Sequence, residues 1–318
     1  MGLPPRLQYF GYAAGWSAVR ALPEPWARAA FNGGAAVAAR KGGNGVRRLR
    51  ANLARVLGEH ASPDHLDRVT AAGVASYARY WREVFRLSVT PYDDIVAGTT
   101  MANEGLMREC YAAGKGVVMV LPHQGNWDYA GVWATLTGMP FTTVAERVEP
   151  AALFDRFVAM REEIGMEVVP LTGGMASPFE LLEARLRAGG MLCLLGDRDL
   201  TARGVEVDFF GAATRFPSGP AALALRTGAA LLPVTLSNRP DGWDLRTHDR
   251  VLAPSAEPGV TDEAAAVAAM TQQVARAFEV GIAEHPQDWH MLQRLWLDDL
   301  APGDPRRRRA GTDAGEPA

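Results

Sequence analysis

The stretch from residue 116 to residue 128, GVVMVLPHQGNWD, decides the fold, because an apolar run ends abruptly in a short polar turn. Residues 117–121 are five consecutive apolar side chains, bounded by glycine on one side and proline on the other. Such a run is typical of a buried strand. Gly125 and Asn126 then suit a tight turn from strand to helix. His123 is therefore expected at the carboxyl end of a strand, where ligands bind in open α/β sheets.

The same pattern continues from about residue 115 onward and predicts an α/β fold. Short β-rich runs alternate with amphipathic segments such as 151–164 and 177–188, and residues 261–283 look like one closing helix. This alternation predicts a central, mostly parallel sheet flanked by helices. The strands predicted in this way are residues 117–121, 142–145, 167–171, 191–195, 231–237 and 243–247.

Residues 7–110 predict a helical N-terminal layer in front of the sheet. Ala, Leu and Arg dominate this part, and prolines 23, 25, 63 and 91 mark expected helix boundaries. Within 69–87, apolar and aromatic side chains such as Tyr77, Trp81 and Phe85 recur at helical spacing, which favours a core-facing stripe. We expect a single domain over residues 1–302. Residues 303–318, rich in Pro, Gly and Arg, are expected to be disordered.

Composition and charge restrict the partners of the chain. Its 318 residues, 48% apolar and 22% charged, have the composition of a folded globular protein. A net charge of −3 gives no reason to expect a nucleic-acid partner. Residues 1–56, however, contain nine Lys or Arg against the single acid Glu24, which indicates either a solvated basic face or contact with an anionic membrane surface. Cys110 and Cys193 lack metal-ligand spacing, so neither a metal site nor a disulfide framework is predicted.

No apolar run reaches the roughly 18 residues that a spanning helix requires. The best candidate, residues 7–19, is interrupted by Gln8, two glycines and Ser17, and it closes on Arg20. It also lacks the clean apolar core and cleavage site of a signal peptide. Its aromatic side chains and flanking arginines suit a helix lying in the membrane interface. A helix packed on the protein core fits the same pattern.

His123 and Asp128 are the first candidates for chemistry. Asp128 is expected in the first turn of the next helix, where it could reach back to the imidazole of His123. A carboxylate that holds one ring nitrogen raises the basicity of the other, as removal of a proton from a hydroxyl requires. No Ser or Cys nucleophile is adjacent and no Gly-x-Ser-x-Gly elbow occurs, which favours direct transfer over a covalent acyl-enzyme. Taken alone, the spacing also fits two residues that merely cap the strand and the helix.

Further blocks extend the pattern and carry a resemblance to a known family. They are GDRD (196–199), GVEVDFFG (204–211), FPSGP (216–220), LRTG (225–228) and WHMLQRLW (289–296). Together with HQGNWD, the chain resembles the membrane-associated lysophospholipid-type acyltransferases, specifically the branch of bacterial lipid A acyltransferases. The tail, and the opening residues 15–16 and 22–25, look like the actinobacterial members that acylate phosphatidylinositol mannosides. The resemblance spans roughly residues 7–300.

The resemblance implies transfer of a fatty acyl group from acyl-CoA, a co-substrate rather than a bound cofactor, to a membrane glycolipid. In the mannoside branch the acceptor is the 6-hydroxyl of a mannose on phosphatidylinositol mannoside. On this mapping His123 is the general base, Asp128 is its partner and Asp197 is a further catalytic acid. This chain has Asp197 where the family pattern looks to carry Glu, so its reach to the imidazole is in question. Glu206 is the other acid that could approach the ring.

The mapping also assigns residues around the base. It implies that Glu146 and Arg161 line the site, although the two could equally form a surface ion pair. Arg161 could instead bind a lipid phosphate through the paired N–H groups of its planar guanidinium. Arg198 and Arg215 are expected to meet the phosphates of coenzyme A or to belong to a solvated face. The turn 218–220 either offers backbone N–H groups to the developing oxyanion or simply starts a helix.

Three rival functions remain at this level. The acceptor could be a lipid A-type saccharide, the chain could be a catalytically silent lipid-binding protein, or His123 and Asp128 could hydrolyse a thioester. The expected location is peripheral, on the cytoplasmic side of the inner or plasma membrane. No motif reports the preferred acyl-chain length or the oligomeric state.

Overall fold

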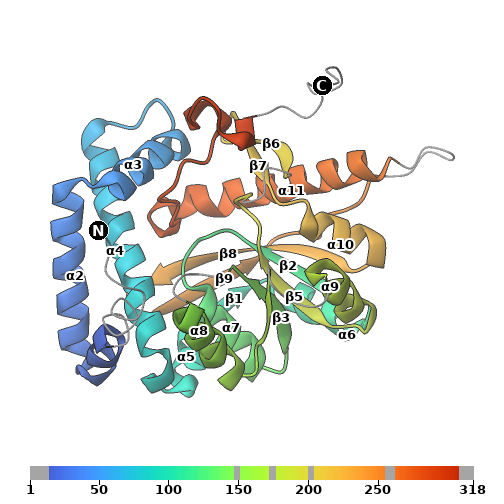
Figure 1. Ribbon diagram of the computed structural model, residues 1–318, viewed down its shortest axis with the longest axis horizontal. Coiled ribbons are helices and arrows are strands. Elements are labelled where there is room, and N and C mark those ends of the chain that lie inside the picture. The colour runs from blue at the N-terminus through green and yellow to red at the C-terminus, as the bar shows by residue number, and fades with distance from the viewer. Residues whose placement is uncertain (1–13, 147–150, 172–176, 200–203, 255–261, 308–318) are drawn as a thin grey trace.

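The computed structural model describes residues 14–146, 151–171, 177–199, 204–254 and 262–307. Within these residues, helices cover both faces of a seven-stranded sheet with the strand order β1-β9-β8-β2-β5-β3-β4, and β6 and β7 form a separate hairpin (Figure 1). The strands are β1 (Thr99–Ala102), β2 (Val117–Leu121), β3 (Phe141–Ala145), β4 (Glu167–Pro170), β5 (Met191–Leu195), β6 (Val205–Phe209), β7 (Ala212–Phe216), β8 (Ala230–Arg239) and β9 (Gly242–Thr247). The helices are α2 (Glu24–Lys41), α3 (Asn44–Leu57), α4 (Pro63–Arg86), α5 (Tyr92–Gly98), α6 (Glu104–Ala112), α7 (Trp127–Leu136), α8 (Ala151–Glu163), α9 (Pro178–Arg187), α10 (Gly219–Thr227) and α11 (Glu263–Glu284).

Strand β2 is the centre of the sheet. It pairs in parallel with β8 on one side and with β5 on the other, and β3 and β4 continue the parallel order beyond β5. Strand β9 runs antiparallel to β8, and β1 is parallel to β9. The predicted α/β class with a mostly parallel sheet is therefore confirmed. Strand β1 was not predicted, because its sequence TTMA is short and half polar.

Alternation along β2 divides its side chains between the two faces of the sheet. Met119 and Leu121 join a core formed with α5, α6, α7 and α8, and we call this side the α7 face. Val118 and Val120 join the opposite core, formed with α9, α10, α11, the β6–β7 hairpin and the C-terminal segment, which we call the α11 face. Figure 1 shows α11 and α10 on one side of the sheet and α7 and α8 on the other.

The predicted helical layer is formed by α2, α3 and α4, in which α2 and α3 each pack on α4 beside the sheet (Figure 1). Helix α4 begins at Pro63, whose fixed φ suits the first helical turn, and the Ser62 hydroxyl accepts a hydrogen bond from the backbone N–H of His65. Residues 14–21 are also helical, whereas residues 7–13 of the predicted interfacial helix lie outside the described residues. In the described part of the chain, no helix is both long enough and apolar enough to cross a bilayer.

The chain after α11 returns over the carboxyl edge of the sheet. The backbone N–H of Gly125 donates to the Asp288 carbonyl at 2.9 Å, and the N–H of His290 donates to the His123 carbonyl at 2.7 Å. Residues 288–290 are thus tied directly to the turn that follows β2. In the tail predicted to be disordered, residues 305–307 form a short 3-10 turn, and residues 308–318 lie outside the described residues.

Candidate active site

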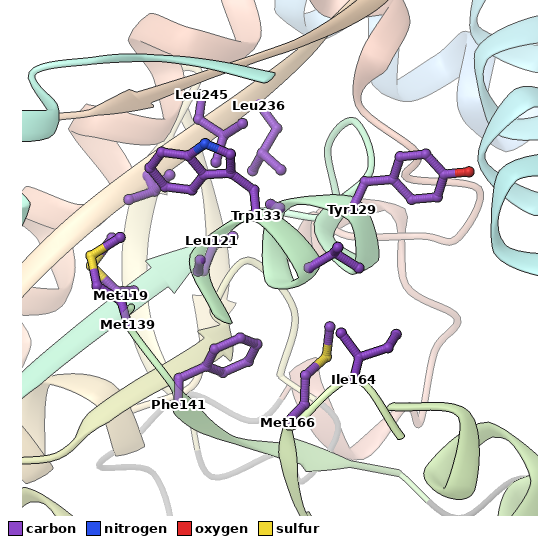
Figure 2. Close-up of a cluster of buried hydrophobic side chains, with 14 of the residues drawn as sticks. Met119, Leu121, Tyr129, Trp133, Met139, Phe141, Ile164, Met166, Leu236 and Leu245 are labelled. Atoms are coloured by element: carbon purple, nitrogen blue, oxygen red, sulfur yellow. The ribbon is translucent and has the colours of Figure 1, made fainter. Parts of the chain in front are cut away.

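A cavity of about 270 Å³ lies on the α7 face, between the sheet and helix α7. Its walls are mainly apolar, and Figure 2 shows five of the side chains that form them, Met119, Leu121, Trp133, Phe141 and Met166. The charged or titratable side chains in its lining are those of Tyr80, His123, Asp128, Glu146, Arg161 and Cys193. The cavity is therefore an apolar chamber with a small group of polar side chains, the usual composition of a ligand site.

His123 lies in the cavity lining and is held from behind by Asp197. The Nδ1 atom of His123 and Oδ1 of Asp197 are 2.5 Å apart, and the other carboxylate oxygen accepts the backbone N–H of His123 at 2.9 Å. The imidazole is partly exposed, whereas the carboxylate is fully buried. A carboxylate on Nδ1 fixes the ring so that Nε2 is the nitrogen available to a reactant.

The sheet register explains why these two residues meet. Strands β2 and β5 are parallel neighbours in which Leu121 is paired with Leu195. His123 and Asp197 each follow these paired residues by two positions, so they leave the sheet side by side. Gly196 permits this approach, because a Cβ atom there would lie 2.3 Å from Val120.

The environment keeps Asp197 ionised. Burial opposes the charge, but the positive charge of His123 and the hydrogen bonds from His123 and Trp289 outweigh it, so the pKa of the carboxyl is lowered. The Trp289 indole N–H donates to Asp197 Oδ2 at 3.0 Å. Asp197 is therefore the acidic partner of the candidate base, and the shorter side chain reaches the ring without difficulty.

The prediction that Asp128 contacts the His123 imidazole is wrong. Among the hydrogen bonds of the described residues, both Asp128 oxygens have other partners: the Arg161 Nε donates to one at 2.7 Å, and the Tyr80 hydroxyl donates to the other at 3.0 Å. The first turn of α7 presents Trp127 to His123, with ring centroids 5.7 Å apart. Asp128 instead points to α8 and α4.

Asp128, Arg161 and Tyr80 form a hydrogen-bonded ion-pair cluster, which we call the Asp128 cluster. Burial opposes the charge of Arg161, but the ion pair with Asp128 outweighs it, and the pKa of the guanidinium is raised. Burial and then the Asp128 charge raise the pKa of Tyr80 well above its ordinary range, so the phenol stays protonated. The cluster joins α4, α7 and α8 along the cavity wall and so holds the shape of the chamber.

Glu146 and Arg198 lie together near the cavity. Glu146 follows β3 and lines the cavity, and its carboxylate is 3.6 Å from Nη2 of Arg198. The alternative that Glu146 pairs with Arg161 is wrong, because Arg161 is bound to Asp128. Arg198 directly follows Asp197 in the chain and is largely buried. Its Nε atom is buried without a hydrogen-bond partner.

Glu206 and Arg215 are not part of the cavity lining. They face each other across the β6–β7 hairpin, 3.9 Å apart, and the position beside His123 that Glu206 was considered for is occupied by Asp197. Their predicted substrate contacts stay predictions. At the turn 218–220, helix α10 begins at Gly219 and none of the three residues lines the cavity, which favours the simpler interpretation as a helix start.

Two residues of the site were not singled out from the sequence. Tyr80 was part of a helical apolar segment, and Trp289 was noted only as part of a tail block. Their partners are 48 and 92 residues away, respectively. A usable signal did exist for Asp197: the runs 117–121 and 191–195 are both five apolar residues followed, two positions on, by a polar side chain. If the two strands are assumed to be neighbours, that equal spacing aligns Asp197 with His123.

Comparison with known proteins agrees with the resemblance seen in the sequence. The family model described as bacterial lipid A biosynthesis acyltransferase matches residues 3–298. The chain is similar to the phosphatidylinositol mannoside acyltransferase of Mycolicibacterium smegmatis, with 48% identity over 304 residues that cover 95% of each chain. It is also 48% identical over 296 residues to the phosphatidylinositol mannoside acyltransferase of Mycobacterium tuberculosis (strain H37Rv), which covers 92% of this chain and 89% of the relative. The predicted family resemblance is therefore confirmed.

Proposed function

This chain belongs to the bacterial lipid A biosynthesis acyltransferase family, and we propose that it transfers a fatty acyl group from acyl-CoA to the 6-hydroxyl of a mannose on phosphatidylinositol mannoside. The acceptor is supported by the names of the two mycobacterial relatives. The observation that carries the chemistry is the His123–Asp197 pair beside an apolar cavity.

The cavity suits the acyl chain of the donor. An apolar chamber offers burial to a hydrocarbon chain at about 0.8 kcal/mol per methylene. The thiol and two hydroxyls in its lining are poor nucleophiles as they stand. Burial raises the pKa of the Cys193 thiol, the Thr143 hydroxyl donates to the Cys193 carbonyl, and the Tyr80 hydroxyl donates to Asp128. This supports direct transfer rather than an acyl-enzyme.

In the proposed mechanism, His123 acts as a general base. Its Nε2 accepts the proton of the mannose hydroxyl while the sugar oxygen attacks the thioester carbonyl. As the tetrahedral intermediate collapses, the carbon–sulfur bond breaks and the imidazolium returns the proton to the coenzyme A sulfur. Asp197 stabilises the imidazolium on Nδ1 throughout. The ester is formed and free thiol is released without a change in oxidation state.

We assign Arg198 to the donor's phosphates because it lies beside Glu146, which lines the cavity, although Arg198 itself does not. It adjoins Asp197, it pairs only loosely with Glu146, and a guanidinium fork suits phosphate oxygens. The roles proposed for Glu206 and Arg215 in substrate binding depend on how far coenzyme A extends from the cavity toward the β6–β7 hairpin.

We further propose that the protein acts as a peripheral protein on the cytoplasmic side of the membrane. Helix α2 and the residues just before it expose Leu22, Trp26 and Val37 to solvent, with Trp26 72% exposed. The basic residues of α2 and α3 accompany them, and this combination favours binding to an anionic lipid surface. A sedimentation assay with phosphatidylglycerol vesicles tests the proposal: Trp26→Ser should weaken binding, and equal binding by the variant contradicts it.

The function is tested by incubating the purified full-length protein with palmitoyl-CoA and phosphatidylinositol mannoside and measuring thiol release and the lipid product. The expected product is one palmitoyl ester on the mannose 6-position, located by fragmentation mass spectrometry. The same assay is run with a lipid A-type saccharide as acceptor and without any acceptor. Octanoyl-CoA serves as a second donor.

Each version of this assay tests a different alternative function. Faster ester formation on the lipid A-type saccharide would replace the proposed acceptor. Thiol release that does not depend on an acceptor would indicate a thioester hydrolase. Vesicle binding without turnover on any acceptor would indicate a lipid-binding protein and contradict the proposal.

A further inference from the structure

We propose that Trp289 is a positioning residue that fixes the orientation of the Asp197 carboxylate toward His123. The inference rests on the proposed role of His123 as the base. It concerns a side chain that does not line the cavity and therefore acts only through Asp197.

The contact geometry supports this role. The Trp289 indole N–H and the backbone N–H of His123 both donate to Oδ2 of Asp197, at 3.0 and 2.9 Å. With Oδ2 held by two donors, Oδ1 is left to the imidazole Nδ1 at 2.5 Å. Two donors that converge on one oxygen restrict rotation of the carboxylate about its Cβ–Cγ bond. Trp289 and Asp197 are both 0% exposed, so bulk water does not reach the oxygen to replace a lost donor.

The indole is itself held rigidly. Its ring packs against Phe209 and Trp296, with centroids 5.9 and 6.1 Å away. Its backbone forms a β-bridge with Gln124, and the neighbouring Asp288 and His290 hydrogen-bond to Gly125 and His123. The segment that carries the donor is therefore fastened to the turn that carries the base. Any displacement of one relative to the other is opposed by these contacts.

Trp296 provides a matched control in the same ring cluster. It is also 0% exposed, and its indole N–H donates to the Phe209 carbonyl at 2.9 Å. Replacing either tryptophan with phenylalanine removes an indole, an N–H donor and similar buried volume. The variants differ in that Trp289→Phe takes its donor from Asp197, whereas Trp296→Phe takes it from a backbone carbonyl.

The test compares wild type, Trp289→Phe, Trp296→Phe and His123→Ala as full-length proteins in the palmitoyl transfer assay. Trp289→Phe should lower kcat about 10- to 100-fold, with the KM values for donor and acceptor changed less than about 3-fold. Trp296→Phe should keep kcat within about 3-fold of wild type. Thermal unfolding of all four proteins shows whether the two phenylalanine variants lose comparable stability.

The pH profile of kcat provides a readout that loss of packing alone would not move. If the carboxylate turns away from Nδ1, the imidazolium loses its stabilising partner, and the acid limb of Trp289→Phe should move to lower pH. A shift to higher pH would mean that the indole tunes the charge of Asp197 rather than its orientation, and would overturn the inference. An unshifted profile would do the same.

The inference and the proposed function fail in distinguishable ways. If His123→Ala remains as active as wild type, the base assignment is wrong and the inference falls with it. If His123→Ala is inactive while Trp289→Phe matches Trp296→Phe in kcat and in pH profile, the inference alone is overturned. Loss of activity in Trp289→Phe with a normal Trp296→Phe and an acid limb at lower pH supports both.

Discussion

The two faces of the central sheet both contain buried aromatic rings, but only the α7 face combines them with a methionine-rich cavity among the described residues. On the α7 face, five methionines line the open cavity, Met101, Met107, Met119, Met166 and Met191. On the α11 face, the core contains five aromatic rings that are fully buried, Phe209, Phe216, Phe278, Trp289 and Trp296. The methionines give the cavity on the α7 face a partly adaptable wall, whereas on the α11 face the large rings pack directly against one another.

The two faces meet two different requirements of the proposed reaction, a site for the acyl chain and support for the base. A fatty acyl chain needs an apolar chamber, and unbranched methionine side chains can adjust to it. The base needs an acid in a fixed orientation, and Asp197 receives this from Trp289 on the α11 face. His123 lies at the carboxyl edge of the sheet between the two cores. It lines the cavity of the α7 face and is paired with Asp197, which Trp289 of the α11 face contacts.

The largest expected effect is the difference in kcat between variants of Asp197 and of Asp128. Asp197→Asn removes the negative charge that supports the His123 imidazolium and should lower kcat on the order of 10³- to 10⁴-fold. Asp128→Asn leaves the buried Arg161 guanidinium without its partner, so it should cost about 3–5 kcal/mol of unfolding free energy but lower kcat of the folded enzyme less than about 10-fold. Steady-state kinetics and chemical denaturation measure both. A deeper loss of kcat in folded Asp128→Asn would restore Asp128 as the partner of the base.

The second prediction concerns His290, which is buried in the segment 288–290 that is tied to the turn after β2. Burial, followed by the charge of His123, lowers its pKa to about 3. The unfolded chain binds a proton near pH 6.5 while the folded protein does not, so stability should fall as pH drops from about 6.5 to about 3, by roughly 4 kcal/mol.

Denaturation at several pH values checks this loss. His290→Asn should flatten the dependence in that window. Ser76→Ala removes the 2.9 Å contact to the His290 Nε2, together with the hydrogen bonds to Asp288 and from Asn238, but leaves the imidazole in place and should keep the pH dependence. Equal slopes for wild type and His290→Asn would show that His290 does not cause the loss.

The third prediction compares the stability of the two cores. Phe278→Ala on the α11 face should cost about 3–5 kcal/mol of unfolding free energy, because the ring is fully buried among large neighbours. Met119→Ala beside the cavity should cost about 2 kcal/mol, because the chamber already leaves part of that side chain without contacts. Urea denaturation measures both. Equal losses would mean that the cavity does not weaken the α7 face.

The smallest effect should appear in donor selection. A Cβ atom on Gly131 would lie 2.6 Å from the end of Met166 and 3.0 Å from Phe141, so Gly131→Ala should push Met166 into the cavity. The ratio of kcat/KM for palmitoyl-CoA to that for octanoyl-CoA should fall about 10-fold. Gly281→Ala on α11, whose Cβ would meet Thr235 of β8, is the control and should lose stability without a change in this ratio. An equal change in both variants would refute the assignment of the cavity to the acyl chain.

Local patterns predicted six of the seven strands of the main sheet, but not which strands are neighbours. Strands β2 and β5 have the predicted bounds because each is an uninterrupted apolar run, and α4 begins at the predicted proline. The choice between Asp128, Asp197 and Glu206 depended on which strand lies beside β2, and a local pattern does not contain that information. Trp289 was out of reach for the same reason, because its partner lies 92 residues away. The cavity is a property of packing that no motif reports.

The central claim is that His123, supported by Asp197, accepts the proton of the acceptor hydroxyl. Single-turnover palmitoyl transfer to phosphatidylinositol mannoside, measured between pH 5 and pH 9 for wild type and His123→Ala, tests it most directly. We expect a wild-type rate that rises with pH through one ionisation and levels off, and a variant rate lower by about 10³-fold or more that lacks this ionisation. A folded His123→Ala protein that keeps its rate within about 10-fold of wild type, with the same pH dependence, would contradict the account.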